Sequence, residues 1–176
     1  MKKKNLYLFD LDGVLINSKN NMKISWNSVL KKINLKITFE KYFSLIGNPF
    51  LTILKKLRIN EKHFRIIETE YNKNSIKNMN KIKLYPKVKY TLNKLLKEKK
   101  IIGILTSKDK ERTRIILRKF KLNLKIVLCP IKSKLGKPNP YQIFNLIKKK
   151  KIRKDDIVYI GDMPVDKLTA KNAGID

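Results

Sequence analysis

Four short runs of apolar residues recur along the chain: NLYLFD at 5–10, IIGILTS at 101–107, KIVLCP at 125–130 and DIVYIGD at 156–162. Each run is too short for a helix and is rich in strand-forming residues, which predicts a β-strand. Because the runs are apolar throughout rather than alternating, both faces of the sheet that they form should be covered. Such covering is typical of parallel sheets.

Helical periodicity follows most of these predicted strands. The pattern predicts helices over 88–98, 109–120, 140–149 and 164–173. Strands that alternate with helices predict an α/β fold built on a doubly wound, Rossmann-like parallel sheet. The side chains expected to face this sheet are Val88, Leu92, Leu95, Leu96, Ile115, Ile116, Phe120, Ile143, Phe144 and Ile147.

The segment between residue 18 and about residue 84 carries helical signals in place of strand signals. Its amphipathic stripes are formed by Met22, Trp26, Val29, Leu30 and Ile33, by Leu51, Leu54 and Leu57, and by Phe64, Ile67 and Tyr71. We therefore expect an α-helical domain over 18–82, inserted into an α/β core formed by 1–17 and 83–176. The sequence KLYPKV at 83–88 returns the chain to that core.

The composition is strongly basic, with 43 Lys and Arg residues against 14 Asp and Glu residues and a formal net charge of +29. The lysines are scattered, and aromatic residues do not alternate with them as a base-stacking surface requires, so a nucleic-acid partner is not favoured. A basic surface still attracts small anionic substrates. The charge pattern leaves the oligomeric state open.

Two further features of the composition restrict the class of protein. No stretch approaches the roughly 20 apolar residues of a membrane span, so we expect a cytoplasmic protein with no membrane partner. The single cysteine, Cys129, excludes an internal disulfide framework. Because no histidine or second cysteine lies near it in the sequence, a zinc site is not expected either.

Asp10 and Asp12 lie at the end of the first apolar run and are followed by Gly13. One interpretation is a hairpin turn, because Asp-Gly is a common turn sequence between strands. The other is a carboxylate site, because side chains two residues apart on a strand share one side and open α/β sheets bind ligands at the carboxyl ends of their strands. The stretch alone does not decide between them.

Polar residues follow the later strands as well: Thr106 and Ser107 after the second, Lys137 after the third, and Asp162 and Asp166 after the fourth. Taken singly, each has a structural explanation in turn formation, helix capping or the helix dipole. In a doubly wound sheet, however, the carboxyl ends of the strands share one edge, so these residues should converge there. Clustered carboxylates suit a hard cation such as Mg²⁺, and a lysine with hydroxyl groups suits a phosphate.

The segments FDLDGVL, LTS, GKPNP and IGDMPVD occur in this order along nearly the whole chain. In these segments the sequence resembles the haloacid dehalogenase superfamily, in its branch of small cytoplasmic phosphatases with a helical C1-type cap. IGNPF in the insertion, LYPKV, GILTSK and KNAGI are also similar to relatives of phosphoglycolate phosphatase. The resemblance implies a Rossmann-like core with an inserted α-helical cap, and a hydrolase that acts on a small phosphorylated metabolite.

The resemblance also implies a role for each candidate residue. Asp10 would attack phosphorus and form an aspartyl-phosphate, and Asp12 would transfer protons to the leaving alcohol and from the attacking water. Mg²⁺ would be held by the Asp10 carboxylate, the Asp12 main-chain carbonyl and Asp162, with Asp166 in support. Phosphate oxygens would be bound by Thr106 and Ser107, and Lys137 would neutralise negative charge.

Other functions stay open at this point. A β-phosphoglucomutase-like phosphotransferase shares these motifs, and a catalytically inactive polyanion-binding protein would explain the charge. Dehalogenation is not favoured, because the dehalogenases lack an acid at the position of Asp12. Relatives normally continue beyond KNAGID with a fifth strand and a final helix, so in the family's strand order of 5-4-1-2-3 the fourth strand is expected at a sheet edge.

Overall fold

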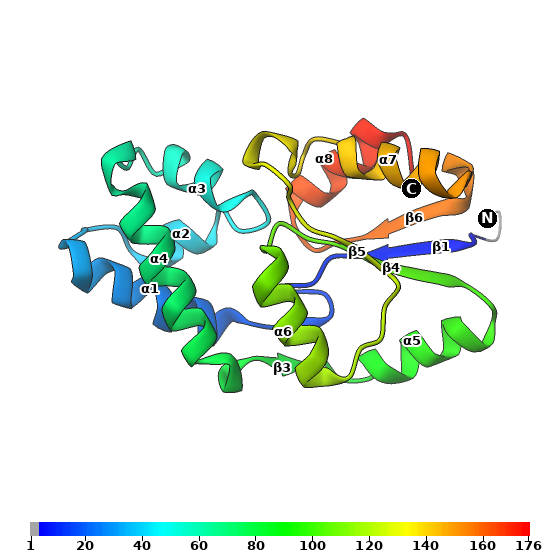
Figure 1. Ribbon diagram of the computed structural model, residues 1–176, viewed down its shortest axis with the longest axis horizontal. Coiled ribbons are helices and arrows are strands. Elements are labelled where there is room, and N and C mark those ends of the chain that lie inside the picture. The colour runs from blue at the N-terminus through cyan, green and yellow to red at the C-terminus, as the bar shows by residue number, and fades with distance from the viewer. Residues whose placement is uncertain (1–3) are drawn as a thin grey trace.

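The computed structural model describes residues 4–176, so residues 1–3 of the expected core lie outside it. The elements form two groups, a parallel sheet covered by helices and a separate group of helices beside one end of that sheet (Figure 1). The chain enters the helical group after its first strand and returns from it before the helix α5 (Val88–Lys97). This arrangement follows the order of elements that the sequence predicts.

The sheet contains β1 (Leu6–Phe9), β4 (Ile101–Leu105), β5 (Ile126–Leu128) and β6 (Ile157–Ile160) in the order β5-β4-β1-β6. All of its pairings are parallel, with Leu6 of β1 in register with Ile101 of β4 and Ile157 of β6. The predicted α/β class with a parallel sheet is therefore confirmed. The hairpin interpretation of Asp10 to Gly13 is wrong, because β1 has a parallel neighbour on each side.

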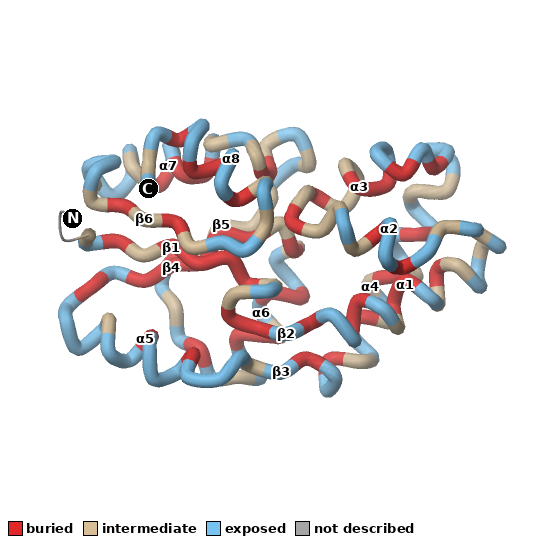
Figure 2. The backbone as a smooth tube through the Cα atoms, turned by 180° about the vertical axis from the view of Figure 1, so that it is seen from behind, coloured by how far each residue is buried: buried red, intermediate tan, exposed pale blue. Residues whose placement is uncertain are grey.

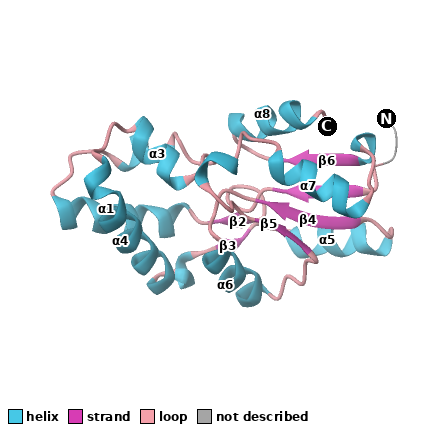
Figure 3. Ribbon diagram, turned by 45° about the horizontal axis from the view of Figure 1, so that its top comes forward, coloured by secondary structure: helices cyan, strands magenta, loops and turns pink. Residues whose placement is uncertain are grey.

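Helices cover both faces of the sheet (Figure 3). Leu6 and Leu8 of β1 pack in one apolar cluster with residues of α7 (Tyr141–Lys150) and α8 (Pro164–Ala173). Phe9 packs in the opposite cluster, with residues of α5 and α6 (Lys110–Phe120). Alternate residues of β1 thus enter two different clusters, as the period of two in a strand requires. The result is a three-layer core in which β1 is central.

The inserted helices are α1 (Lys19–Ile33), α2 (Phe39–Phe43), α3 (Phe50–Lys56) and α4 (Phe64–Lys77). They bury an apolar cluster of their own, in which the Trp26 and Tyr42 rings stack with centroids 4.2 Å apart. Seen from behind, these helices lie apart from the sheet and keep their buried residues on their inner sides (Figure 2). The residue boundaries of the inserted domain, 18 and 82, stay a prediction.

A short antiparallel ribbon joins the two groups of elements, and the sequence pattern did not reveal it. It pairs β2 (Ile16–Asn17) with β3 (Lys83–Leu84), so the chain leaves and re-enters the core at adjacent positions. Two residues per strand are too few for a periodic pattern to be recognised. The pairing fixes where the inserted helices stand relative to the end of β1.

Two of the side chains expected to face the sheet are exposed. Leu96 has an exposed fraction of 52% and Phe144 one of 41%, because each lies at the margin of its helical stripe. Leu146 is buried on α7 instead, and the Lys154 ammonium lies 4.9 Å from the centroid of the Phe144 ring. The helices were correctly predicted, but the width of the buried stripe was overestimated.

β6 pairs with β1 on one side and lies at the edge of the sheet, where the fourth strand was expected. On its other side, the Tyr159 amide donates a hydrogen bond of 2.7 Å to the carbonyl of Asp176. Across residues 4–176, no helix combines the length and the apolar character that crossing a membrane requires.

Candidate active site

The carboxyl ends of three adjacent strands bring the predicted polar residues together. Asp10 follows β1, Thr106 follows β4 and Asp162 lies two residues after β6. The Asp10 amide donates 2.8 Å to the carbonyl of Ile160, so the ladder between β1 and β6 extends to the aspartate itself. The backbone of a buried sheet therefore fixes the position of Asp10.

Lys137 lies in the loop before α7, and its ammonium group is buried between two carboxylates. It donates 2.9 Å to Oδ1 of Asp10 and 2.6 Å to Oδ1 of Asp166. Burial opposes the charged ammonium, but the two carboxylates outweigh it and raise the pKa of Lys137. Lys137 is therefore a fixed positive charge beside Asp10, as the sequence predicted from its place in GKPNP.

Tyr159 of β6 completes this buried group, although no pattern in the sequence indicated it as a site residue. Its hydroxyl accepts a hydrogen bond of 2.8 Å from Lys137 Nζ. Its single proton can be donated to the carbonyl of Leu105 at 3.0 Å or to Oδ1 of Asp166 at 2.9 Å. Burial, with the neighbouring carboxylates, raises the pKa of Tyr159 and keeps the hydroxyl protonated. The only signal in the sequence was a polar atom within an otherwise apolar strand.

The environment of Asp10 disfavours its charged form. Burial raises the pKa of Asp10 to about 7, and the negative charges of Asp166 and Asp12 act in the same direction, against the attraction of Lys137. Oδ1 accepts from Lys137, whereas Oδ2 has no hydrogen-bond donor among the described residues. Since no fully buried polar side-chain atom within residues 4–176 lacks a partner, Oδ2 of Asp10 is not fully buried. It is the oxygen through which Asp10 can bind a metal or react.

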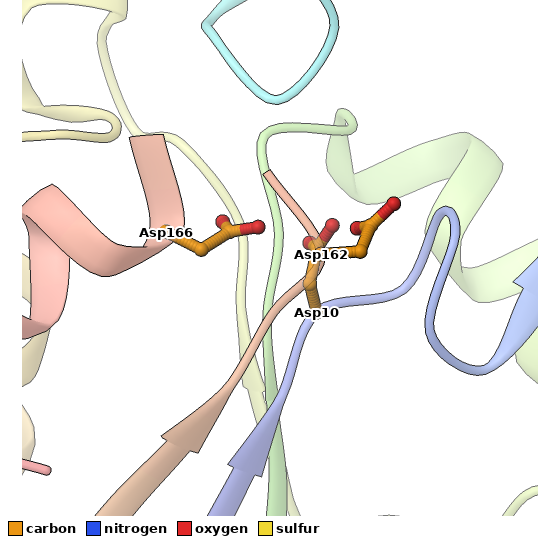
Figure 4. Close-up of side chains that lie close together, drawn as sticks. All are labelled: Asp10, Asp162 and Asp166. Carbon is orange, nitrogen blue, oxygen red and sulfur yellow. The ribbon is translucent and has the colours of Figure 1, made fainter. Parts of the chain in front are cut away.

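Three carboxylates converge at this edge of the sheet (Figure 4). Asp10, Asp162 and Asp166 each place an oxygen within 4.8 Å of the others. Asp162 is exposed as a residue, but its carboxyl group is partly covered by the protein, and this desolvation together with the Asp166 charge raises the pKa of Asp162. Gly13 has a φ of +89°, and a Cβ there would lie 2.1 Å from Oδ2 of Asp162. Glycine at position 13 thus leaves room for the carboxylate group.

Asp166, in the first turn of α8, has two roles at once: it caps the helix and it belongs to the group of charges at the site. Its Oδ2 accepts 3.0 Å from the amide of Met163, which caps α8, while its Oδ1 accepts from Lys137. Both oxygens are already engaged, so Asp166 is suited to support a bound cation rather than to coordinate it through a free oxygen. Helix capping and a role in the site are therefore compatible.

Asp12 stands at the mouth of the site with two donors of its own. Ser18 Oγ donates to Oδ1, and Lys108 Nζ lies 3.2 Å from Oδ2. Lys108 was not predicted as a site residue, although it directly follows Thr106 and Ser107 in the sequence. Nothing in the sequence distinguishes Lys108 from the many other lysines. Its burial in the fold is what distinguishes it.

The two predicted hydroxyl residues are adjacent but differently engaged. Thr106 is buried, and its Oγ1 accepts 3.2 Å from the amide of Lys108. Ser107 Oγ donates to the carbonyl of Gly47, in the loop between α2 and α3. The Ser107 hydroxyl therefore connects the core to the inserted helices, while Thr106 remains beside Asp10.

A cavity of about 40 Å³ lies between the core and the inserted helices, directly over Asp10 and Asp12. The inserted helices contribute aromatic and apolar side chains to it, among them Tyr42, Phe50 and Tyr71. The core contributes Thr106, Ser107, Lys108 and Arg112. Sites for drug-sized ligands measure roughly 300–1,000 Å³, so this cavity suits a small substrate.

The chain is similar to known proteins along almost its entire length. The model of the haloacid dehalogenase-like hydrolases matches residues 7–176. Phosphoglycolate phosphatase from Haemophilus influenzae strain 86-028NP is 26% identical over 180 residues, which cover 94% of this chain and 80% of that protein. Pyrophosphatase PpaX from Oceanobacillus iheyensis is 31% identical over 101 residues, or 57% of this chain and 47% of that protein.

A solved structure extends this similarity to three dimensions. The crystal structure of a predicted phosphoglycolate phosphatase from Haemophilus somnus is 28% identical and has a TM-score of 0.86. The match covers 99% of this chain and 84% of that one. Sheet and inserted helices are thus arranged in the same way in both proteins.

Proposed function

The chain belongs to the haloacid dehalogenase-like hydrolase family, and on that premise we propose that it is a Mg²⁺-dependent phosphatase acting on a small phosphorylated metabolite. The substrate would be a phosphomonoester similar to phosphoglycolate. The observation that carries the proposal is the Asp10 carboxylate, whose Oδ1 accepts from Lys137 and which lines the same cavity as Asp12.

In the proposed reaction, Asp10 attacks the phosphorus atom of the substrate. The bond from Asp10 to phosphorus forms as the ester P–O bond breaks, and the leaving alcohol takes a proton from Asp12. Asp12 then takes a proton from water, which attacks phosphorus and releases inorganic phosphate and the free carboxylate. Lys137 supports the first step, because two anions must approach each other and its ammonium lies 2.9 Å from Asp10.

The acidic residues fit a hard divalent cation. Oxygens of Asp10, Asp162 and Asp166 lie within 4.8 Å of one another, and oxygen donors are those that Mg²⁺ prefers. We propose Asp10, Asp162 and the main-chain carbonyl of Asp12 as its ligands, with Asp166 in support. When bound, the cation would supply positive charge that offsets the charge of the phosphoryl oxygens.

The test is phosphate release from a panel of phosphomonoesters by the purified protein, with Mg²⁺ and after removal of divalent cations by a chelator. Release only with Mg²⁺, and its loss in Asp10→Asn, is the expected result. No release from any ester by folded protein with Mg²⁺ would contradict the proposal. If hexose 1-phosphate is converted to 6-phosphate without phosphate release, the protein is a phosphotransferase instead.

The same variant separates the proposal from polyanion binding. A catalytically inactive basic protein would bind DNA or RNA with a steep dependence on salt, and Asp10→Asn would leave that affinity unchanged. The phosphatase proposal expects Asp10→Asn to abolish phosphate release while leaving any such salt-dependent binding as it was. The cytoplasmic location stays a prediction.

A further inference from the structure

The cavity over Asp12 contains two cations that the proposed reaction does not use. Among the residues that line it, the positively charged ones are Lys108 and Arg112, and both are buried. Lys137 lies behind Asp10, where Asp166 and Tyr159 surround it. Burying a charged side chain is unfavourable unless a partner compensates it. The buried positive charge of Lys137 is explained by its contact with Asp10, whereas those of Lys108 and Arg112 need another explanation.

Lys108 lines the cavity beside Asp12, the residue proposed as proton donor to the leaving group. Its side chain is 4% exposed, and its ammonium lies 3.2 Å from Oδ2 of Asp12. Asp12 is the residue proposed to give its proton to the leaving oxygen, so Lys108 is next to that oxygen rather than behind the phosphoryl group. An ammonium has three donors, and one carboxylate oxygen does not use them all.

Arg112 presents the remaining part of its guanidinium group to the same cavity. It lies in the first turn of α6, where Nε donates to Oδ2 of Asp109, and its guanidinium carbon is 5.3 Å from the ring centroid of Tyr71 on α4. Asp109 accepts from Nε, and the Tyr71 side chain also engages the guanidinium group. Because Arg112 also lines the cavity, the rest of its fork can contact a ligand there.

We propose, on the basis of the phosphatase function above, that Lys108 and Arg112 bind an anionic oxygen group on the leaving-group part of the substrate. The shared chemistry is a carboxylate or a second phosphate, each of which matches the planar fork of arginine and the ammonium of lysine. The cavity measures only about 40 Å³, which favours a short leaving group. Lys108 and Arg112 are then specificity-determining residues.

The experiment compares three substrates that share a phosphoryl group: phosphoglycolate, its methyl ester and pyrophosphate. The variants are Arg112→Met and Lys108→Met, which keep apolar bulk and remove the charge. The matched controls are Arg114→Met and Lys110→Met, which remove exposed cations of the same helix. Circular dichroism and thermal unfolding establish that each variant is folded.

The wild type should prefer at least one doubly anionic substrate to the methyl ester by about 30-fold or more in kcat/KM. Whether phosphoglycolate or pyrophosphate is preferred identifies the carboxylate or the second phosphate as the natural group. Arg112→Met should abolish most of that preference through a higher KM, while Arg112→Lys restores part of it. The control variants should change kcat/KM by no more than about twofold for any of the three substrates.

A direct binding measurement separates recognition from chemistry. Titration calorimetry compares Asp10→Asn with the double variant that also carries Arg112→Met. The double variant should bind the preferred substrate more weakly and the methyl ester equally well. If Arg112→Met and Lys108→Met lower kcat/KM equally for the charged substrates and for the methyl ester, this inference is overturned. The phosphatase function would still stand, because phosphate is released. Absence of phosphate release from every ester would overturn both.

Discussion

Two buried lysines stand beside two carboxylates of the candidate site, Asp10 and Asp12, and the surroundings of the two lysines differ. Lys137 is held by Asp10, Asp166 and Tyr159, at distances of 2.6 to 2.9 Å. Lys108 has one charged partner, Asp12, at 3.2 Å, and it lines the cavity. Each side chain is almost fully buried, so burial alone does not distinguish them.

The number of partners does distinguish the two lysines. Lys137 has acceptors for all of its donors, so its charge is fixed in place before any substrate binds, which is the arrangement that favours electrostatic catalysis. Lys108 keeps donors that a ligand can use. On the proposed function, the lysine whose donors are all engaged would act on the reacting phosphoryl group, and the lysine with donors to spare would contact the rest of the substrate.

Lys137→Met is expected to have the largest effect. It leaves the carboxylates of Asp10 and Asp166 buried without their cation, and breaking a buried ion pair in this way costs about 3–5 kcal/mol. Phosphate release should fall about 10³-fold. Urea unfolding and turnover of a neutral-leaving-group ester measure the two effects.

Lys108→Met is the matched comparison for that variant. It should reduce the free energy of unfolding by less than Lys137→Met does, because Asp12 keeps the Ser18 donor and is partly accessible to water. Equal loss of stability in the two variants would show that the lysines are equivalent and would contradict the comparison.

Asp10→Asn should stabilise the metal-free protein at neutral pH while abolishing activity. The pKa of Asp10 is raised from 3.8 to about 7, so ionised Asp10 opposes folding. This penalty is fully present above pH 7 and disappears as the pH falls from 7 to 4, because the folded state then binds the proton that the unfolded state has lost. At pH 7.5 the gain should be about 2–4 kcal/mol.

Thermal and urea unfolding across this pH range check the sign. The stability difference between Asp10→Asn and wild type should shrink toward pH 4, and adding Mg²⁺ should stabilise the wild type more than the variant. A variant that is less stable than wild type at pH 7.5, or a difference independent of pH, would show that the carboxylate is not destabilising in the folded protein.

Tyr159→Phe should have the smallest effect of these substitutions. It removes one of the three acceptors of Lys137 but leaves both carboxylates in place. A hydrogen bond to a charged group contributes about 1.5–3 kcal/mol, so we expect a loss of about that size and a roughly tenfold decrease in kcat with little change in KM. Tyr90→Phe, at an exposed tyrosine of α5, is the matched control.

The predictable part of the site was the part fixed by the order of strands. Asp10, Thr106 and Asp162 each follow a recognisable apolar run, and a parallel sheet necessarily brings such positions to one edge. The expected parallel fold and the insertion of helices followed from the same pattern. Lys137 on its own was one lysine among many, and it was identified through the segment GKPNP and the family resemblance that this segment carries.

The unpredicted part depends on packing between elements that are distant in sequence. Tyr159 is distinguished by the position of one hydroxyl within an apolar strand, and Lys108 and Arg112 only by the cavity that the inserted helices close over them. Tyr71 was expected on an apolar stripe of the insertion, and both Tyr71 and Tyr42 belong to its buried cluster. The hydrophobic periodicity of one sequence predicts that such a ring is buried. It does not predict that one edge of the ring also lines a cavity facing the core.

The central claim is that Asp10 carries the phosphoryl group, and chemical trapping during turnover tests it most directly. The enzyme is mixed with Mg²⁺ and an excess of its best substrate, treated at once with borohydride, which reduces an acyl phosphate to an alcohol, and mapped by peptide mass spectrometry. We predict conversion of Asp10 to homoserine, dependent on substrate and absent from Asp10→Asn. Rapid phosphate release with an unmodified Asp10, or with modification at another residue, would contradict the account.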